Sequence, residues 1–296
     1  MLKKVLFRLL TVLLLAVFLV SGGMVLYRQF EYVQSAGDYD DALRVAGLTE
    51  SKPQQTPKFT AKAKTKPAPT PQAGDSSAGD NEDTQESQPE ASSTPAPEDE
   101  PVPLPEEAQP LTAVDLPALQ SVNPEVVGWL EIPDVLSFPL LHTQDNQHYL
   151  THSWNNSYNS CGSIFLECQN QPDFSGFHTI IYGHRMDNDA MFGVLRFYQE
   201  PGYWQEHPLF YVYDGDTIRE YEIFSVFEAD VQGIVYRLDL EERKEEFISQ
   251  CVESSEIDTG IVPSPEEQFV TLSTCPRSGY ATRLVVMAHL INEYSE

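Results

Sequence analysis

The chain is poor in basic residues and in cysteine. Its 296 residues include 18 Lys and Arg against 45 Asp and Glu, a net charge of -27. This sign repels phosphate backbones and excludes nucleic-acid binding as a function. Four cysteines are too few for a disulfide scaffold, and no CxxC pair or His/Cys cluster has the spacing of a zinc site. The acidic residues form no DxDxDG-like loop, so we expect no metal and no cofactor.

Large apolar residues are nearly absent from a segment near the first third of the chain. Between Ser51 and Pro110 lie 12 of the 22 prolines, together with Ser, Thr, Ala, Gln and Gly. Such a composition buries too little apolar area to offset the entropy of ordering the backbone. We therefore predict a disordered Pro-rich stalk over residues 51–110.

The N-terminus carries the one long apolar run. Leu9–Leu26 contains no charged side chain, and at about 1.5 Å per residue it is long enough to cross a bilayer core. Residues 1–8 carry only basic charges, so the positive-inside rule predicts a cytoplasmic N-terminus and an extracellular remainder. A cleaved secretory signal is the alternative, because Ser21, Gly22 and Gly23 are small. The apolar run continues past them, which favours a transmembrane signal-anchor over 9–26. Between this anchor and the stalk we predict a juxtamembrane segment over 27–50.

Residues 111–296 have the composition of one globular domain, long enough to bury most of its unfolded surface in a single core. Short segments rich in Val, Ile, Phe and Tyr alternate with turn residues, which favours an antiparallel barrel or sandwich. The predicted strands are Gly128–Ile132, Gly162–Glu167, His178–Tyr182, Leu209–Tyr213, Arg219–Phe227, Gln268–Thr274 and Arg283–Leu290. Helical periodicity predicts two helices, Leu111–Val122 and Asp239–Val252, the second capped by Asp239.

The most informative segment is Thr271–Cys275, an alternating strand that ends in a cysteine before a turn. A thiol at the rim of a sheet is accessible to a substrate, whereas a thiol in mid-strand is usually inert. The next strand begins near Arg283, so an antiparallel hairpin brings its guanidinium across from the sulfur of Cys275. That arrangement suits a donor for the oxyanion that forms when a thiolate attacks a carbonyl.

A proton partner for this thiol is found at the end of another predicted strand. His184 follows Ile180–Gly183 and opens a loop, so its imidazole can point into a shared cleft and protonate an amine leaving group. A lone cysteine is more often core filler, and a lone histidine is more often a surface residue. Together, Cys275, His184 and Arg283 supply the three residue types that acyl transfer needs.

These motifs resemble those of the class B sortases, membrane-anchored cysteine transpeptidases of Gram-positive bacteria. The resemblance covers Leu111 to about Leu290. The segments that carry it are TLSTC at 271–275, TRLVV at 282–286, YGHRM at 182–186, MFGVL at 191–195, VNPEVVGWLEIP at 122–133, DNQHYL at 145–150 and GSIFLE at 162–167. It implies a closed eight-stranded β-barrel with an N-terminal helix and a helix inserted before the cysteine strand.

The resemblance also implies the reaction and its participants. Cys275 attacks a C-terminal sorting signal of a secreted protein after Thr and forms a thioacyl intermediate, His184 protonates the leaving amine, and Arg283 stabilises the oxyanion. An amine of a peptidoglycan cross-bridge or of a pilin then accepts the protein at the cell membrane. The residues implied to border the substrate are Asn146, Leu150, Ser273 and Thr274. The sequence departs from the family in the histidine loop, where Arg185, Asp187 and Asp189 flank His184 with opposing effects.

Two alternatives to transfer remain open. A cysteine endopeptidase acting on wall peptides would use the same three residues and release the acyl group to water. A stalked binding module would use Cys275 only as a structural residue. The other cysteines read as free thiols: Cys161 and Cys168 flank one strand on opposite faces, and Cys251 lies on the apolar face of a helix. We interpret the three tryptophans as packing residues: Trp129, Trp154 and Trp204.

Overall fold

The computed structural model describes residues 2–48, 103–275 and 281–295. The chain divides into two compact units, one formed by Met1–Thr56 with Leu104–Glu296 and the other by Pro57–Pro103. The second unit, apart from Pro103, lies outside the described residues, and so does the predicted stalk up to residue 102. Of the region predicted as stalk, residues 103–110 are described, and Ala108 is fully buried there.

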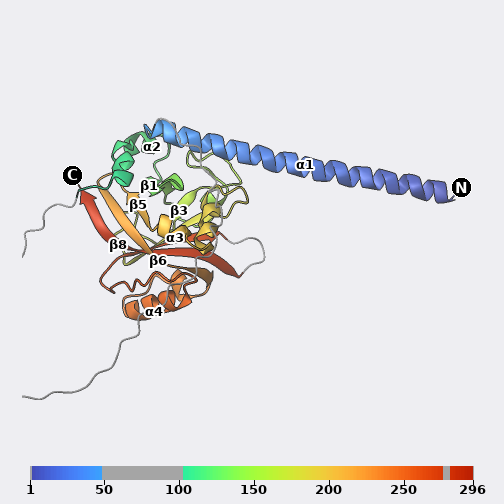
Figure 1. Cartoon of the computed structure of the whole chain (residues 1–296). Coiled ribbons are helices and arrows are strands. Elements are labelled where there is room, and N and C mark those ends of the chain that lie inside the picture. Colours follow the sequence, from blue (N-terminus) through green and yellow to red (C-terminus); the bar gives the residue numbers. More distant parts are fainter. Residues whose placement is uncertain (1, 49–102, 276–280, 296) are drawn as a thin grey trace, which may run out of the picture. The chain divides into compact units, whose positions relative to one another are not determined.

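The larger unit is built on a closed barrel with the strand order β1-β2-β3-β4-β7-β8-β6-β5. The strands are β1 (Val126–Ile132), β2 (Leu136–Leu141), β3 (Ile164–Leu166), β4 (His178–His184), β5 (Leu209–Tyr213), β6 (Thr217–Asp230), β7 (Phe269–Cys275) and β8 (Thr282–Ser295). The helices are α1 (Leu2–Val45), η1 (Glu106–Ala113), α2 (Leu116–Val122), η2 (His148–Leu150), η3 (Phe192–Gln199), α3 (Tyr203–Glu206), η4 (Ile234–Tyr236) and α4 (Lys244–Ser254). Figure 1 shows α2 and α4 on opposite sides of the barrel.

The predicted eight-stranded barrel, with an N-terminal helix and a helix before the cysteine strand, is confirmed. The strand β2 is not among the predicted strands, and it contains Pro139 although proline normally disfavours a strand interior. The predicted helix Leu111–Val122 is divided into η1 and α2. The break lies at Asp115, whose carboxylate accepts a hydrogen bond from the Ala118 N–H at 2.9 Å and caps α2.

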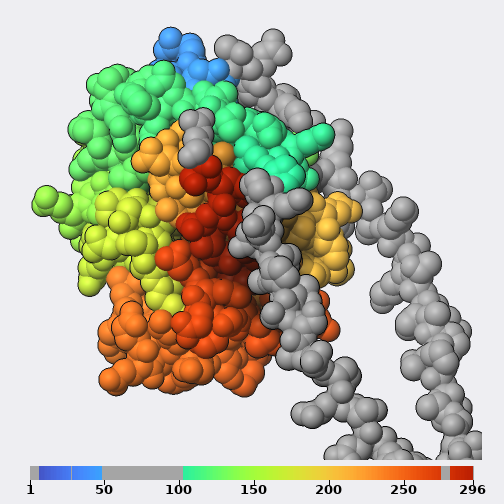
Figure 2. Space-filling view, turned by 90° about the vertical axis from the view of Figure 1, so that its left-hand side faces the viewer, coloured from blue at the N-terminus to red at the C-terminus, as the bar shows by residue number. Residues whose placement is uncertain are grey.

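The prediction that Asp239 caps the second helix is wrong. The helix α4 begins at Lys244, and the carboxylate of Asp239 instead accepts two hydrogen bonds from the guanidinium of Arg237. The apolar face expected for this helix is present, since Phe247, Ile248 and Cys251 are buried. Figure 2 shows the orange segment that contains α4 on one side of the red β8, with the green segment that contains η1 and α2 on the other.

The feature of the barrel that positions the candidate site is a parallel pair of strands. β4 and β7 run side by side in the same direction, with His178 opposite Phe269 at one end and His184 opposite Cys275 at the other. Parallel neighbours end at the same edge of a sheet, so residues that close the two strands share one rim. β7 and β8 are antiparallel, and β8 therefore begins at that rim.

Candidate active site

Three backbone positions converge at this rim of the barrel. His184 is the direct register partner of Cys275 across β4 and β7. On the other side of β7, Ser273 is opposite Val285, and Cys275 and Arg283 each lie two residues closer to the rim. The positions predicted for nucleophile, proton donor and oxyanion donor therefore lie on three neighbouring strands. The side chain of Cys275 and residues 276–280 lie outside the part of the chain that is described.

The imidazole of His184 is half-buried and fixed by the backbone. Its Nε2 lies 2.7 Å from the carbonyl oxygen of Leu150. A carbonyl oxygen only accepts, so Nε2 carries the hydrogen. Nδ1 is then the ring nitrogen that remains to exchange a proton with a reacting group. Leu150, predicted to border the substrate, thus also orients the candidate general acid through its main chain.

Gly162 makes this contact geometrically possible. Its φ is +61°, a left-handed conformation that disfavours side chains, and a Cβ there would lie 2.4 Å from the Tyr149 oxygen and 3.0 Å from Cδ2 of His184. We expect Gly162→Ala to lower the free energy of unfolding by about 2 to 4 kcal/mol, because strain and a backbone clash combine. Chemical denaturation measures this loss, and peptide cleavage should fall with it.

Gly260→Ala is the matched control for this prediction. Gly260 has a φ of +70°, but nothing lies within 4 Å of the Cβ position. The control therefore reports the backbone strain alone, about 1 kcal/mol. Equal losses in the two variants would contradict a clash at Gly162.

The guanidinium of Arg283 lies between two aromatic rings. Its Cζ is 5.6 Å from the ring centre of Tyr182 and 5.3 Å from that of Tyr236, within the range of cation–π attraction. Among the described residues, its buried Nε has no hydrogen-bond partner. The rings hold the planar group in place without using its N–H donors, which leaves those donors available to an incoming oxygen.

A buried carboxylate links this aromatic pair to the loop that precedes η2. Glu167 Oε2 accepts hydrogen bonds from the Tyr182 hydroxyl at 3.0 Å and from the Asn146 amide at 2.7 Å. Burial and the neighbouring Glu167 raise the pKa of Tyr182, so its hydroxyl remains a donor. The side-chain oxygen of Asn146 accepts from the Cys168 N–H at 2.8 Å. Asn146 therefore fixes its own loop against β3 and β4.

The remaining residues predicted to border the substrate lie below the rim. Ser273 is fully buried, and its hydroxyl is 2.9 Å from that of Tyr236. Thr274 is also buried and donates to the Leu284 carbonyl at 3.2 Å. The two side chains point to opposite faces of β7, and each is engaged inside the protein, Ser273 with Tyr236 and Thr274 with the Leu284 carbonyl. They support the site from beneath.

Cysteines 161, 168 and 251 are free thiols in the structure, as expected. Burial raises the pKa of Cys161 and of Cys251. Burial also raises the pKa of Cys168, and the nearby Glu167 adds to the effect. The thiolate is the nucleophilic form of cysteine, so all three are poor nucleophiles at neutral pH. Cys275 is therefore the candidate nucleophile among the four cysteines.

Two of the three charged residues that flank His184 form ion pairs with other side chains. Arg185 lies 3.6 Å from the carboxylate of Glu228, and Asp189 forms an ion pair with Arg196. Both of these charges are therefore partly compensated. Among the described residues, no group of three or more His, Cys, Asp and Glu side chains could hold a metal ion.

Sequence reasoning missed the aromatic and acidic residues behind the predicted catalytic positions. Tyr182 lies two residues before His184, so strand alternation places the two side chains on one face, and this signal was available. Tyr236 and Glu167 reach the site from η4 and from the end of β3, and nothing in their local sequence indicates this. Both depend on the closure of the barrel.

A closed barrel with cysteine, histidine and arginine at one rim defines a class of cysteine transpeptidases, and comparisons agree. The family described as the sortase domain matches residues 130–291. Sortase B of Listeria monocytogenes is 32% identical over 184 residues, covering 60% of this chain and 75% of the relative.

Solved structures show the same likeness. A Staphylococcus aureus sortase B–substrate complex matches with a TM-score of 0.57 and 25% identity, covering 60% of this chain and 84% of that one. A sortase B complexed with triglycine matches with a TM-score of 0.56 and 26% identity, covering 60% and 86%. The chain belongs to the sortase family, and within it to class B.

Proposed function

We propose that this sortase cleaves a C-terminal sorting signal of exported proteins after Thr and transfers the protein to an amine. The observation that carries the proposal is the β4–β7 register, which pairs His184 with Cys275. In the proposed reaction the Cys275 thiolate attacks the carbonyl of Thr, and Arg283 donates hydrogen bonds to the resulting oxyanion. His184 protonates the departing amine, and a thioester remains on Cys275.

The second half of the reaction reverses the proton transfer. An incoming amine attacks the thioester, His184 takes its proton, and the new amide leaves while the thiolate is restored. A sortase B complexed with triglycine and another complexed with a substrate are consistent with peptides reaching such a site in relatives. We propose a peptidoglycan cross-bridge or a pilin as the physiological source of the amine.

The substrate groove is proposed to pass between the loop that precedes η2 and the aromatic pair around Arg283. Asn146 and Leu150 are half-buried and remain candidates for direct contact with the peptide. Ser273 and Thr274 are covered, and for them we propose a supporting role in place of contact.

The proposed location is the outer face of a cell membrane. The helix α1 contains a segment, Phe7–Val45, that is long and apolar enough to cross a bilayer, with a mean hydropathy of 2.6 in its most apolar window. Basic residues at positions 3, 4 and 8 favour a cytoplasmic N-terminus. In this arrangement the anchor is the first part of α1 and the barrel is extracellular.

Product analysis tests the proposal. The full-length protein in detergent is incubated with short peptides containing a Thr-Gly or Thr-Asn bond, with and without triglycine as the probe amine. We expect cleavage after Thr, a faster rate with triglycine, and an amide product identified by mass spectrometry.

Two results would contradict transfer. A free carboxylate as sole product, at a rate independent of triglycine, would favour the endopeptidase alternative. Failure of every peptide to react, together with ordinary reactivity of Cys275 toward a thiol alkylator, would favour the binding module.

A further inference from the structure

The last third of α1 packs on the barrel unit through a buried apolar face. Ala42, Leu43 and Ala46 are 0%, 6% and 0% exposed, and the ring of Tyr39 lies 4.3 Å from that of Phe138 in β2. The helix end is fixed as well, because the Ala46 carbonyl accepts a hydrogen bond from the Asp115 N–H at 2.9 Å. This part of the helix that carries the predicted anchor is therefore part of the same core as the barrel.

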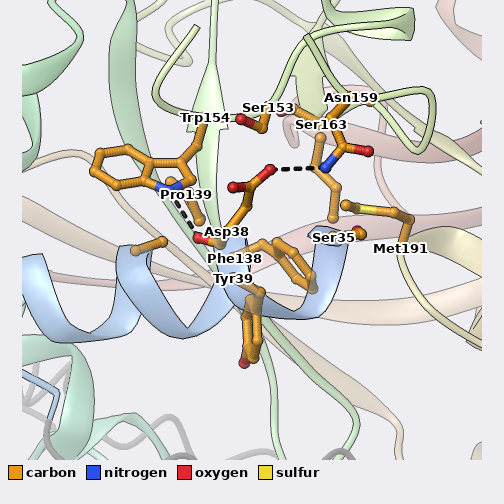
Figure 3. Close-up of a pocket in the computed structure, with 13 residues that line it drawn as sticks. Ser35, Asp38, Tyr39, Phe138, Pro139, Ser153, Trp154, Asn159, Ser163 and Met191 are labelled. Carbon is orange, nitrogen blue, oxygen red and sulfur yellow. Dashed lines mark hydrogen bonds between the residues drawn. The ribbon is translucent and has the colours of Figure 1, made fainter. Parts of the chain in front are cut away.

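Asp38 is the polar centre of this contact (Figure 3). Its carboxylate Oδ2 accepts a hydrogen bond from Asn159 Nδ2 at 2.7 Å, and its main-chain oxygen accepts one from Trp154 Nε1 at 2.8 Å. Both partners are 3% exposed and belong to the segment between η2 and β3. One residue of α1 therefore satisfies two buried donors of that segment.

The same segment leads directly to His184. The Asn159 carbonyl accepts from the Gly162 N–H at 2.9 Å, and the Cβ position of Gly162 is 3.0 Å from Cδ2 of His184. The next residue, Ser163, donates through its N–H to the Tyr149 carbonyl at 2.9 Å. The carbonyl of Leu150, next in sequence, is the one that binds the His184 ring. Four hydrogen bonds thus connect the carboxylate of Asp38 to the imidazole of His184, with backbone segments between them.

The space between α1 and the barrel is too small to bind a ligand. The cavity lined by Asp38, Tyr39, Trp154 and Asn159 has a volume of about 20 Å³, which accommodates a single water molecule. Figure 3 shows the carboxylate of Asp38 directed toward Asn159, while the side chain of Tyr39 extends away from them. The polar groups there serve to join two elements.

We propose that Asp38 is a positioning residue for His184. Through this residue, the helix that carries the membrane anchor also helps to orient the imidazole in the active site. The inference rests on the proposed role of His184. Asp38 holds the segment 152–163 through Asn159 and Trp154, and that segment holds the Gly162 and Leu150 backbone against the imidazole. Loss of the carboxylate frees a buried amide and lets the ring move away from its partner.

The pH dependence of Cys275 alkylation tests this role without requiring a known substrate. An imidazolium beside a thiolate lowers the cysteine pKa, so a displaced His184 raises it. The full-length protein in detergent is treated with iodoacetamide across the neutral range, and modification of Cys275 is followed by peptide mass spectrometry. We expect Asp38→Ala to slow the reaction at pH 7 by about tenfold and to move the midpoint of the profile about one unit upward.

Two further variants make the result specific. Asp38→Asn keeps an oxygen that can accept from Asn159 and is expected to restore the wild-type profile. Asp40→Ala removes an exposed carboxylate on the same helix and is expected to leave it unchanged.

The outcomes distinguish failure of the positioning role of Asp38 from failure of the proposed function. A lower melting temperature for Asp38→Ala with an unchanged profile would overturn the positioning role and leave only a structural one. If His184→Ala also matches the wild-type profile, then the proposed function itself fails.

Discussion

Alanine at position 275 is expected to abolish cleavage of Thr-containing peptides, with a loss of about 10⁴-fold or more. The reason is that no other thiol of the chain can replace this one. Cys161 and Cys251 are buried, and burial raises the pKa of each. Cys168 is half-buried beside Glu167, which also raises its pKa. Removal of the nucleophile should leave only the slow reaction with water, measured as peptide cleavage by the full-length protein.

Cys168→Ala is the matched control, because it removes the least buried of the three other thiols. We expect it to keep peptide cleavage within about twofold, in line with the small effect of most substitutions that touch no reacting group. Serine at position 275 should be as inactive as alanine, since a hydroxyl beside His184 is a much weaker nucleophile at neutral pH than a thiolate. Activity in Cys275→Ala comparable to that of Cys168→Ala would exclude the cysteine mechanism.

The pairing of the strands that carry Cys275 and Arg283 was predictable from local sequence. Cys275 and Arg283 belong to strands that are consecutive in the chain, with only residues 276–281 between β7 and β8, and so close a spacing allows few possible registers. The observed β7–β8 pairing, with Ser273 opposite Val285, agrees with the one expected. Nearness in the chain was enough here, because β7 is buried on both faces from Phe269 to Thr274 and burial of one face alone does not fix its register.

The pairing of His184 with Cys275 could not be predicted from local patterns. His184 and Cys275 are register partners in parallel strands, and the chain between them forms η3, α3, β5, β6, η4 and α4 before it returns. Pairing across such a crossover depends on barrel closure, which no short segment encodes. The motifs suggested that the two residues meet, and the parallel register gives the physical reason.

The role of α1 was hidden for a different reason. The first part of its sequence is an apolar anchor, and the contact with the barrel is made further along by a mixed set that includes Asp38, Tyr39 and Leu43. The hydrogen-bond donors to Asp38 come from Trp154 and Asn159, which lie 116 and 121 positions further along the chain. Leu48 and Leu104 both pack against the same core cluster, so the two ends of the proline-rich region attach to one body. The helix α1 and the barrel therefore belong to one compact unit.

Replacement of Arg283 by lysine is expected to lower kcat by about 10²- to 10³-fold while KM changes little, because an oxyanion donor acts mainly in the transition state. Lysine keeps the positive charge but loses the planar group that lies between the rings of Tyr182 and Tyr236. Its ammonium would have no fixed orientation relative to the reacting carbonyl. Steady-state kinetics with the best peptide from the Thr-Gly and Thr-Asn set measures the effect.

The control for Arg283→Lys is Arg237→Lys, at an exposed arginine that hydrogen-bonds Asp239. It should leave kcat and KM unchanged. If Arg283→Lys instead raises KM at constant kcat, then the guanidinium binds the peptide equally in the ground state and the transition state, and its proposed role changes from oxyanion donor to substrate anchor. The buried Nε, which has no hydrogen-bond partner among the described residues, argues for the former role, because such a donor is available to an oxygen that appears only during reaction.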